Sequence, residues 1–232
     1  MKKKIGMIGG IGPESTVDYY QRLVKLYQQK VDPDGYPELV IDSINMTAML
    51  KRQADGDWDG LARMLLESIQ SLSRAGADFA FIASNTPHIV FEVVKRESPI
   101  PLVSIVEAAR GEADRLGLKK LGLLGTRFTM RSDFYQAEFR KSGMEIVVPN
   151  GEEQQYIHEK LFSEIERGIF REDTRQGLLA IAGRLAREEG IDSVILGCTE
   201  LPLILTQEKY GIPYLNTTRI HVDRIMEVYL AS

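Results

Sequence analysis

The chain repeats part of itself, and this repeat limits the folds that it can adopt. The stretch KLGLLGT at 120–126 echoes KIGMIGG at 4–10, and GIDSVILGCT at 190–199 echoes GADFAFIASN at 76–85. The offsets are 122 − 6 = 116 residues for the first pair and 198 − 84 = 114 residues for the second. Two repeated segments with nearly the same offset indicate that the chain consists of two similar halves. By this register, Ser84 and Cys198 occupy equivalent positions, each directly after an apolar run.

Both halves alternate short apolar runs with helical periodicity, which predicts α/β halves, each with a parallel sheet covered on both faces. Strands are expected at 4–8, 39–44, 79–83, 100–103, 120–126, 145–148, 191–197 and 212–215. Helices are expected at about 13–27, 58–73, 106–116, 132–141, 153–166, 174–189 and 218–230. The segment after Cys198 could cross back and complete the first half. The expected domains are therefore 1–103 together with 210–232, and 104–209.

Composition excludes several classes of function. The net charge of −4 argues against a nucleic-acid partner, which favours a basic surface. No run in the sequence approaches the roughly 20 apolar residues of a membrane span. The single cysteine rules out an internal disulfide and a thiolate metal cage. The expectation is a protein of a reducing, cytoplasmic compartment.

Cys198 is the first candidate for chemistry, because it follows a predicted buried strand. Parallel-sheet enzymes place reactive groups beyond the carboxyl ends of their strands. A thiol at such a place can act as a nucleophile or base, since its ionisation can be tuned toward neutral pH. The alternative is a buried, inert cysteine, which is common in protein cores.

The glycine loop at 10–15, GIGPES, resembles a nucleotide-binding fingerprint only in part. It lacks the third glycine, and Glu14 stands where a phosphate would approach. Its backbone N–H groups at a helix start, including that of Gly10, suit a carboxylate better. Asn85, Thr86 and Thr199 could hold the same carboxylate. Helix capping is the alternative for each of these three residues.

Other polar residues follow the expected strand ends. Thr126 and Thr129 are candidate anion contacts after the strand at 120–126, whereas Arg127 suits a surface charge. His88 and His221 could orient a loop or tune a proton relay, although the sequence shows no carboxylate partner for either.

Four motifs together resemble the aspartate/glutamate racemase family, in the branch nearest the aspartate racemases, over nearly the whole chain. They are GGIGPEST at 9–16, NTPH at 85–88, GCTE at 197–200 and NTTRIH at 216–221. The resemblance implies two Rossmann-like domains related by a pseudo-twofold axis, an active site between them and usually a homodimer. It also implies cofactor-independent catalysis, with two cysteines on opposite sides of the substrate Cα. One cysteine removes a proton and the other returns one.

The sequence departs from that pattern at the first base, where Ser84 replaces the cysteine. A hydroxyl is a far weaker acid than a thiol, so Ser84 is expected to return a proton slowly. Family members with threonine there handle L-substrates. By analogy, Cys198 would abstract the proton of the L-enantiomer.

A second departure concerns the substrate side chain. Relatives that bind a side-chain carboxylate use an arginine and a lysine, and the aligned positions here hold Met46 and Glu166. Candidate replacements are Arg52, Gln53, Arg127 and Arg167.

The leading hypothesis is a racemase of aspartate or glutamate, with Cys198 as the base and Ser84 as its partner. The expected substrate contacts are Gly10, Gln53, Asn85, Thr86, Thr126, Thr129, Thr199 and Glu200. One alternative is a one-cysteine decarboxylase or cis–trans isomerase of a small diacid. Another is a carboxylate-binding protein without turnover.

Overall fold

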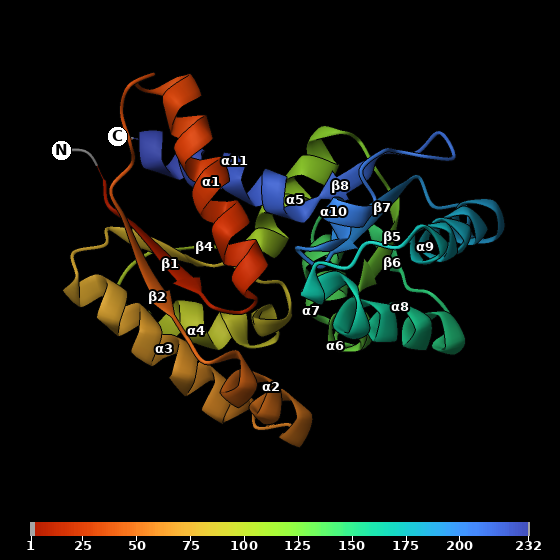
Figure 1. The fold of residues 1–232 in the computed structure, drawn as a ribbon, viewed down its shortest axis with the longest axis horizontal. Helices are drawn as coiled ribbons and strands as arrows, with labels where there is room; N and C mark the ends of the chain where they lie inside the picture. The colour runs from red at the N-terminus through yellow and green to blue at the C-terminus, as the bar shows by residue number, and fades with distance from the viewer. Residues whose placement is uncertain (1–2, 232) are drawn as a thin grey trace. The chain divides into compact units, whose positions relative to one another are not determined.

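The computed structural model describes residues 3–231, and the chain forms two compact units (Figure 1). The first unit comprises Met1–Ile105 and His221–Ser232, and the second comprises Val106–Ile220. The second unit thus reaches further than the expected boundary at residue 209. The reason is that the strand at 214–216 pairs within the second sheet, so the chain returns to the first unit later.

The first unit contains a four-stranded parallel sheet in the order β2-β1-β3-β4. Its strands are β1 (Ile5–Gly9), β2 (Leu39–Ser43), β3 (Phe79–Ile82) and β4 (Leu102–Val103). Its helices are α1 (Pro13–Lys30), α2 (Met46–Asp55), α3 (Trp58–Arg74), η1 (Thr86–Val90), α4 (Phe91–Glu97) and the end of α11 (Thr217–Leu230). The central strands β1 and β3 are buried throughout, which explains why they read as continuous apolar runs.

The second unit has a parallel sheet in the order β6-β5-β7-β8. Its strands are β5 (Lys120–Gly125), β6 (Glu145–Val147), β7 (Ser193–Gly197) and β8 (Tyr214–Asn216). Its helical segments are α5 (Ile105–Arg115), α6 (Arg127–Arg131), α7 (Phe134–Arg140), α8 (Gly151–Ser163), η2 (Ile165–Arg167), α9 (Glu172–Arg184), the π-turn η3 (Leu185–Glu189) and α10 (Leu201–Ile204).

The two sheets have the same strand order, which confirms two similar α/β halves. β1 corresponds to β5 and β3 corresponds to β7, in agreement with the two sequence echoes. Ser84 and Cys198 therefore follow equivalent inner strands of their own sheets.

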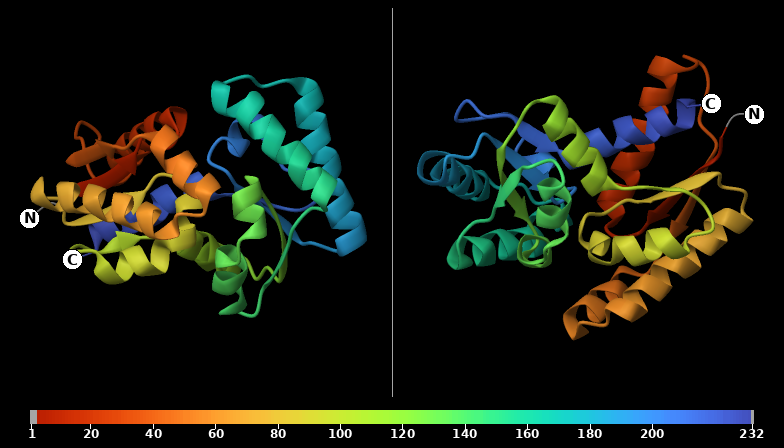
Figure 2. Two further views of the ribbon diagram at one scale, coloured as in Figure 1. Left: turned by 90° about the horizontal axis from the view of Figure 1, so that it is seen from below. Right: turned by 180° about the vertical axis from the view of Figure 1, so that it is seen from behind.

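Side chains of the first sheet alternate between two cores, because successive residues of a strand point to opposite faces. Phe79 and Phe81 pack with residues of α1 and α11 on one face. Ala80 and Ile82 pack with residues of α3 and α4 on the other, and the helices lie accordingly on the two sides of this sheet (Figure 2).

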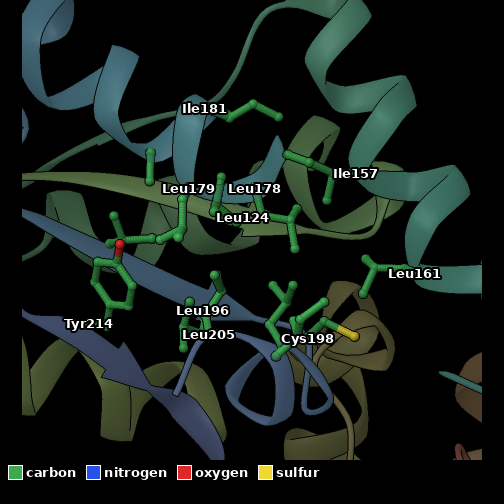
Figure 3. Packing of buried hydrophobic residues seen from close by; sticks show 14 of the residues in the cluster. Leu124, Ile157, Leu161, Leu178, Leu179, Ile181, Leu196, Cys198, Leu205 and Tyr214 are labelled. Carbon is green, nitrogen blue, oxygen red and sulfur yellow. The ribbon is translucent and has the colours of Figure 1, made fainter. Parts of the chain in front are cut away.

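In the second unit, one large cluster joins β5 and β7 to α8, α9 and α10. Cys198 belongs to this cluster, together with Leu196 and Leu205 (Figure 3). Within residues 3–231, no helix has the length and apolar character needed to cross a bilayer.

Candidate active site

Cys198 lies one residue beyond β7, in the turn that leads to α10. Gly197 ends the strand where space is tight, since a Cβ there would stand 2.7 Å from Leu123 Cδ1 and 2.9 Å from the Leu124 carbonyl oxygen. The Cys198 side chain is 6 % exposed, and its sulfur lies at the margin of the apolar cluster in Figure 3.

Two side chains beside the thiol share one carboxylate oxygen. Cys198 Sγ donates to Glu200 Oε2 at 3.0 Å, and Thr199 Oγ1 donates to the same atom at 2.8 Å. Glu200 is buried, so these bonds compensate part of the cost of removing its carboxylate from water. Thr199 therefore supports Glu200 instead of capping α10.

The pKa of the Cys198 thiol is raised well above its ordinary value. Burial is the main cause, and the negative charges of Glu200 and Glu166 add to it. At neutral pH the resting group is thus a thiol. To act as a base it must first transfer its proton, and Glu200 is in place to accept it.

Glu166 is the second acid near this thiol. It lies in the short turn η2, between α8 and α9, and is half-buried. Burial, followed by the charge of Glu200, raises its pKa to about 7. Glu166 therefore titrates near neutral pH, and its ionised form adds a second negative charge near Cys198.

The threonines predicted after β5 are placed by local structure. Thr126 caps α6, and its hydroxyl accepts from the Thr129 backbone N–H at 3.3 Å. The two hydroxyl oxygens lie 3.2 Å apart, and Thr129 is fully buried. Thr126, which the sequence suggested as an anion contact, therefore has a capping role in this structure.

Two further threonines follow β8, the strand next to β7. Thr217 Oγ1 donates to the Leu196 carbonyl oxygen at 2.8 Å. In the strand register Leu196 pairs with Asn216, where β8 ends, and Thr218 lies in the first turn of α11 directly after it. Thr218 is 1 % exposed, and its Oγ1 has no hydrogen-bond partner within the described chain. Thr218 is not among the site residues that the sequence predicts, although it lies in the NTTRIH motif at 216–221.

In the first unit, the glycine loop joins β1 to α1. Gly10 has a φ of +81°, and a Cβ there would stand 2.5 Å from the Ile44 carbonyl oxygen. Its N–H donates to Thr16 Oγ1 at 2.9 Å. The Gly10 N–H is therefore used inside the loop, and the close approach to Ile44 explains why glycine is needed.

Ser84 follows β3 and is half-buried, at the place equivalent to Cys198. Asn85 and Thr86 are buried beside it. Asn85 precedes η1 without a side-chain capping bond, so capping does not explain this residue. Gln53 is buried in α2, and its Nε2 has no partner in the described part of the chain.

The two histidines of this unit are neutral supports. His88 Nε2 accepts the Ile105 N–H at 3.4 Å, and burial lowers its pKa to about 4. His221 Nε2 lies 3.0 Å from the Val103 carbonyl oxygen, so Nε2 carries the proton and Nδ1 accepts from Tyr19 OH at 2.9 Å. Burial lowers the pKa of His221 to about 3.

The cations proposed for a substrate carboxylate are engaged elsewhere or exposed. Arg52 Nη1 pairs with Asp57 Oδ2 at 2.6 Å, and Arg127 Nη1 donates to Gln155 Oε1 at 3.0 Å. Arg167 is exposed.

Comparison with known proteins identifies the family. The model of the family described as "Asp/Glu/Hydantoin racemase" matches residues 8–225. The chain belongs to this family. Its membership confirms, at the level of the family, the expectation of an amino-acid racemase and so of an isomerase.

Individual members of the racemase family cover the chain from end to end. A broad specificity amino-acid racemase of Bacillus subtilis is 25 % identical over 98 % of both chains. An aspartate racemase homologue from Pyrococcus horikoshii has a TM-score of 0.86 and 38 % identity, covering 99 % of this chain and 100 % of its own. A candidate Asp/Glu racemase from Yersinia pestis has a TM-score of 0.91 and 29 % identity over 99 % and 100 % of the two chains.

Proposed function

We propose that the protein is a cofactor-independent amino-acid racemase in which Cys198 is the base that attacks one face of the substrate Cα. The observation that carries this proposal is the hydrogen bond from Cys198 Sγ to Glu200 Oε2 at the end of β7. A thiol at that strand end, with a buried proton acceptor already in contact, is arranged for proton transfer.

In the proposed mechanism, Glu200 takes the thiol proton and Cys198, as the thiolate, removes the proton from Cα. The electron pair left on Cα delocalises into the α-carboxylate. The Ser84 hydroxyl then gives a proton to the opposite face, water reprotonates the resulting alkoxide, and Glu200 returns its proton to the hydroxide that is left, while Cys198 keeps the Cα proton as its thiol. The donation from Ser84 is slow, because a serine hydroxyl is a much weaker acid than a thiol.

Hydrogen-bond donors near the two strand ends would stabilise the charge that develops on the α-carboxylate. Asn85 and Thr86 directly follow Ser84, and Thr218 lies in the first turn of α11, directly after β8. Thr199 would act indirectly, since its hydroxyl donates a hydrogen bond to the Glu200 carboxylate and not to the substrate.

Solvent exchange tests the proposal directly. The full-length protein is incubated in deuterium oxide with both enantiomers of a panel that includes aspartate, glutamate, alanine, methionine and lysine. Loss of the Cα–H signal by NMR is expected for at least one amino acid, and Cys198→Ala should abolish it. Failure of every amino acid to exchange, with Cys198 intact, would refute the proposal.

A second variant tests the role of Ser84. Ser84→Cys replaces the hydroxyl with a thiol, whose pKa of about 8.5 permits much faster proton transfer. We expect net racemisation to rise at least tenfold. Unchanged racemisation in a folded Ser84→Cys protein would remove Ser84 from the mechanism.

A single cysteine also suits a reaction that needs a thiol on only one face of a small diacid, either decarboxylation or cis–trans isomerisation. Release of carbon dioxide, or consumption of maleate without Cα exchange, would favour that function. A ligand that raises the melting temperature but stays unchanged after long incubation would favour a carboxylate-binding protein.

A further inference from the structure

We propose that His88 and His221 are positioning residues for the Ser84 hydroxyl. His88 attaches the turn after Ser84 to the start of α5, and His221 attaches the strand before Ser84 to α11. The two histidines thus hold Ser84, from both sides, to the segments through which the chain passes between its units. The proposal rests on the proposed function and adds two residues that place one of its proton donors.

The chain passes between the two units twice, after Ile105 and after Ile220. The first connection lies at the start of α5, shortly after β4, and the second lies inside α11, after β8. The proposed reaction uses Ser84 of the first unit and Cys198 of the second. Proton transfer depends steeply on geometry, so the groups that anchor these two connections beside Ser84 bear directly on its reaction.

His88 attaches the Ser84 turn to the first connection. It lies four residues after Ser84 in η1, and its side chain is 3 % exposed. Its Nε2 accepts the backbone N–H of Ile105 at 3.4 Å, so the neutral ring carries its proton on Nδ1. The ring stacks on Phe91 with centroids 4.8 Å apart, and the His88 backbone N–H donates to the Asn85 carbonyl oxygen at 3.0 Å. His88 therefore couples the start of α5 to the turn that follows Ser84.

His221 attaches the second connection to the strand that leads to Ser84. Its ring is fully buried and meets Phe81 of β3 edge-on, with centroids 5.3 Å apart. Nε2 donates to the carbonyl oxygen of Val103, the residue that pairs with Phe81 in the sheet. Nδ1 accepts from Tyr19 OH at 2.9 Å, which fixes the ring at its other nitrogen. Since Phe81 lies three residues before Ser84, both flanks of Ser84 are attached to a connection.

The second unit builds a sheet of the same strand order without such a histidine. At the offset of 114 residues, the position equivalent to His88 is 88 + 114 = 202, which is Pro202. The helix after its last strand, α11, has a local cap, since the Arg219 N–H donates to Asn216 Oδ1 at 3.0 Å. In the first unit, an N–H at the start of α5 goes instead to a side chain from the Ser84 turn. A local cap would complete the fold, so His88 points to a role beyond folding.

The experiment separates inversion from exchange in deuterium oxide, with exchange followed by NMR and racemisation by chiral chromatography. Cys198 alone can exchange the Cα–H of one enantiomer without inverting it, whereas racemisation also needs the Ser84 hydroxyl. We expect His88→Leu, which removes the acceptor of the Ile105 N–H, to lower the ratio of racemisation to exchange at least tenfold. His88→Gln carries an amide oxygen that can accept this N–H, and its ratio should stay within threefold of the original protein. His221→Phe keeps an aromatic ring but loses both hydrogen bonds, and its ratio should also fall.

Leu72→Ala is the matched control, because it destabilises the first unit from the core on the other face of the sheet, and it should leave the ratio unchanged. An equal fall of the ratio in Leu72→Ala and His88→Leu would overturn the inference, since loss of stability alone would explain both. An unchanged ratio in folded His88→Leu and His221→Phe would also overturn it, as would failure of both variants to fold, because the histidines would then be structural. These outcomes leave the racemase intact, whereas absence of exchange with every amino acid in the original protein would refute the racemase itself.

Discussion

The carboxylate of Glu200 has two opposed effects on Cys198. Its charge raises the pKa of the thiol and so disfavours the thiolate. Its Oε2 also accepts a hydrogen bond from the thiol at 3.0 Å, so in the proposed reaction Glu200 can take the thiol proton. A reactive thiolate would then exist only while Glu200 is protonated, and the resting cysteine is protected from alkylation and oxidation.

Replacement of Glu200 should separate the two effects. In Glu200→Gln, loss of the negative charge lowers the thiol pKa, so alkylation of Cys198 by iodoacetamide at pH 8 should become faster. Loss of the proton acceptor should lower kcat for Cα exchange by about 100-fold. Both rates are measured on the same folded preparation. If alkylation and exchange fell together, Glu200 would instead be required for the shape of the turn.

Glu166 should make stability depend on pH. Its folded pKa of about 7 lies above its ordinary value of 4.5, so the folded state binds the extra proton between these values. Stability is therefore full below about pH 4.5 and falls as the pH rises through 7, by up to about 3 kcal/mol and less where solvent reaches the half-buried carboxyl.

Denaturant unfolding of Glu166→Gln and the original protein at pH 5, 6, 7 and 8 measures this effect. The variant should gain relative stability as the pH rises, and Glu152→Gln, which removes the same charge from an exposed site on α8, should follow the original protein. A constant difference across this range would mean that Glu166 ionises normally in the folded state.

At the scale of helices and strands, periodicity predicted most of the fold. The eight strands are found within a few residues of their expected positions, because both sheets are covered on two faces and their inner strands are continuously apolar. Helix α2 is absent from the expected helices, although Met46, Met49 and Leu50 form a short apolar stripe on it that packs against the first core. The strand at 214–216 was expected, but not its pairing with β7, because strand order is a long-range property.

The glycine loop offers a matched pair of substitutions. Gly10 and Gly56 both have positive φ, but only Gly10 is crowded: a Cβ at Gly56 would meet nothing within 4 Å. We expect Gly56→Ala to cost about 1 kcal/mol, from backbone strain alone. Gly10→Ala should cost about 2–4 kcal/mol, because the loop must also move away from Ile44. Equal losses in unfolding experiments would show that the loop accommodates the methyl group.

At the scale of the molecule, the candidate site was only partly predictable. The internal repeat placed Ser84 and Cys198 at equivalent strand ends, and the GCTE motif selected Glu200. The resemblance aligns Glu166 with a substrate-binding position of the family, but its effect on the pKa of Cys198 could not be predicted, because the two residues lie far apart in sequence. Thr126 was selected by the same reasoning about strand ends, yet its hydroxyl is used for capping.

The first unit should lose stability as the pH falls below 6.5, at a pH where ordinary carboxylates are still ionised. The pKa values of His88 and His221, about 4 and about 3, lie below the ordinary 6.5, so the unfolded chain binds protons first. Stability is full above pH 6.5 and is lost as the pH falls, by up to about 3 kcal/mol per histidine at pH 4.

Unfolding curves for His221→Asn test this expectation. The variant should be less stable at pH 7.5, because Tyr19 OH and the Val103 carbonyl lose their partner, but its stability should fall less between pH 6.5 and 4. An unchanged pH dependence would show that His221 is not the group responsible.

Helix α11 carries Val222, Ile225 and Met226 into the same core as Phe79 and Phe81. These residues are made after the whole second unit, because the ribosome synthesises the chain from its N-terminus. During translation, the face of the first sheet that α1 and α11 share is therefore covered by α1 alone until the complete second unit has been synthesised. A nascent chain of this design would be exposed to aggregation for most of its synthesis, and chaperones that bind apolar surface would find their target in the first half, not the second.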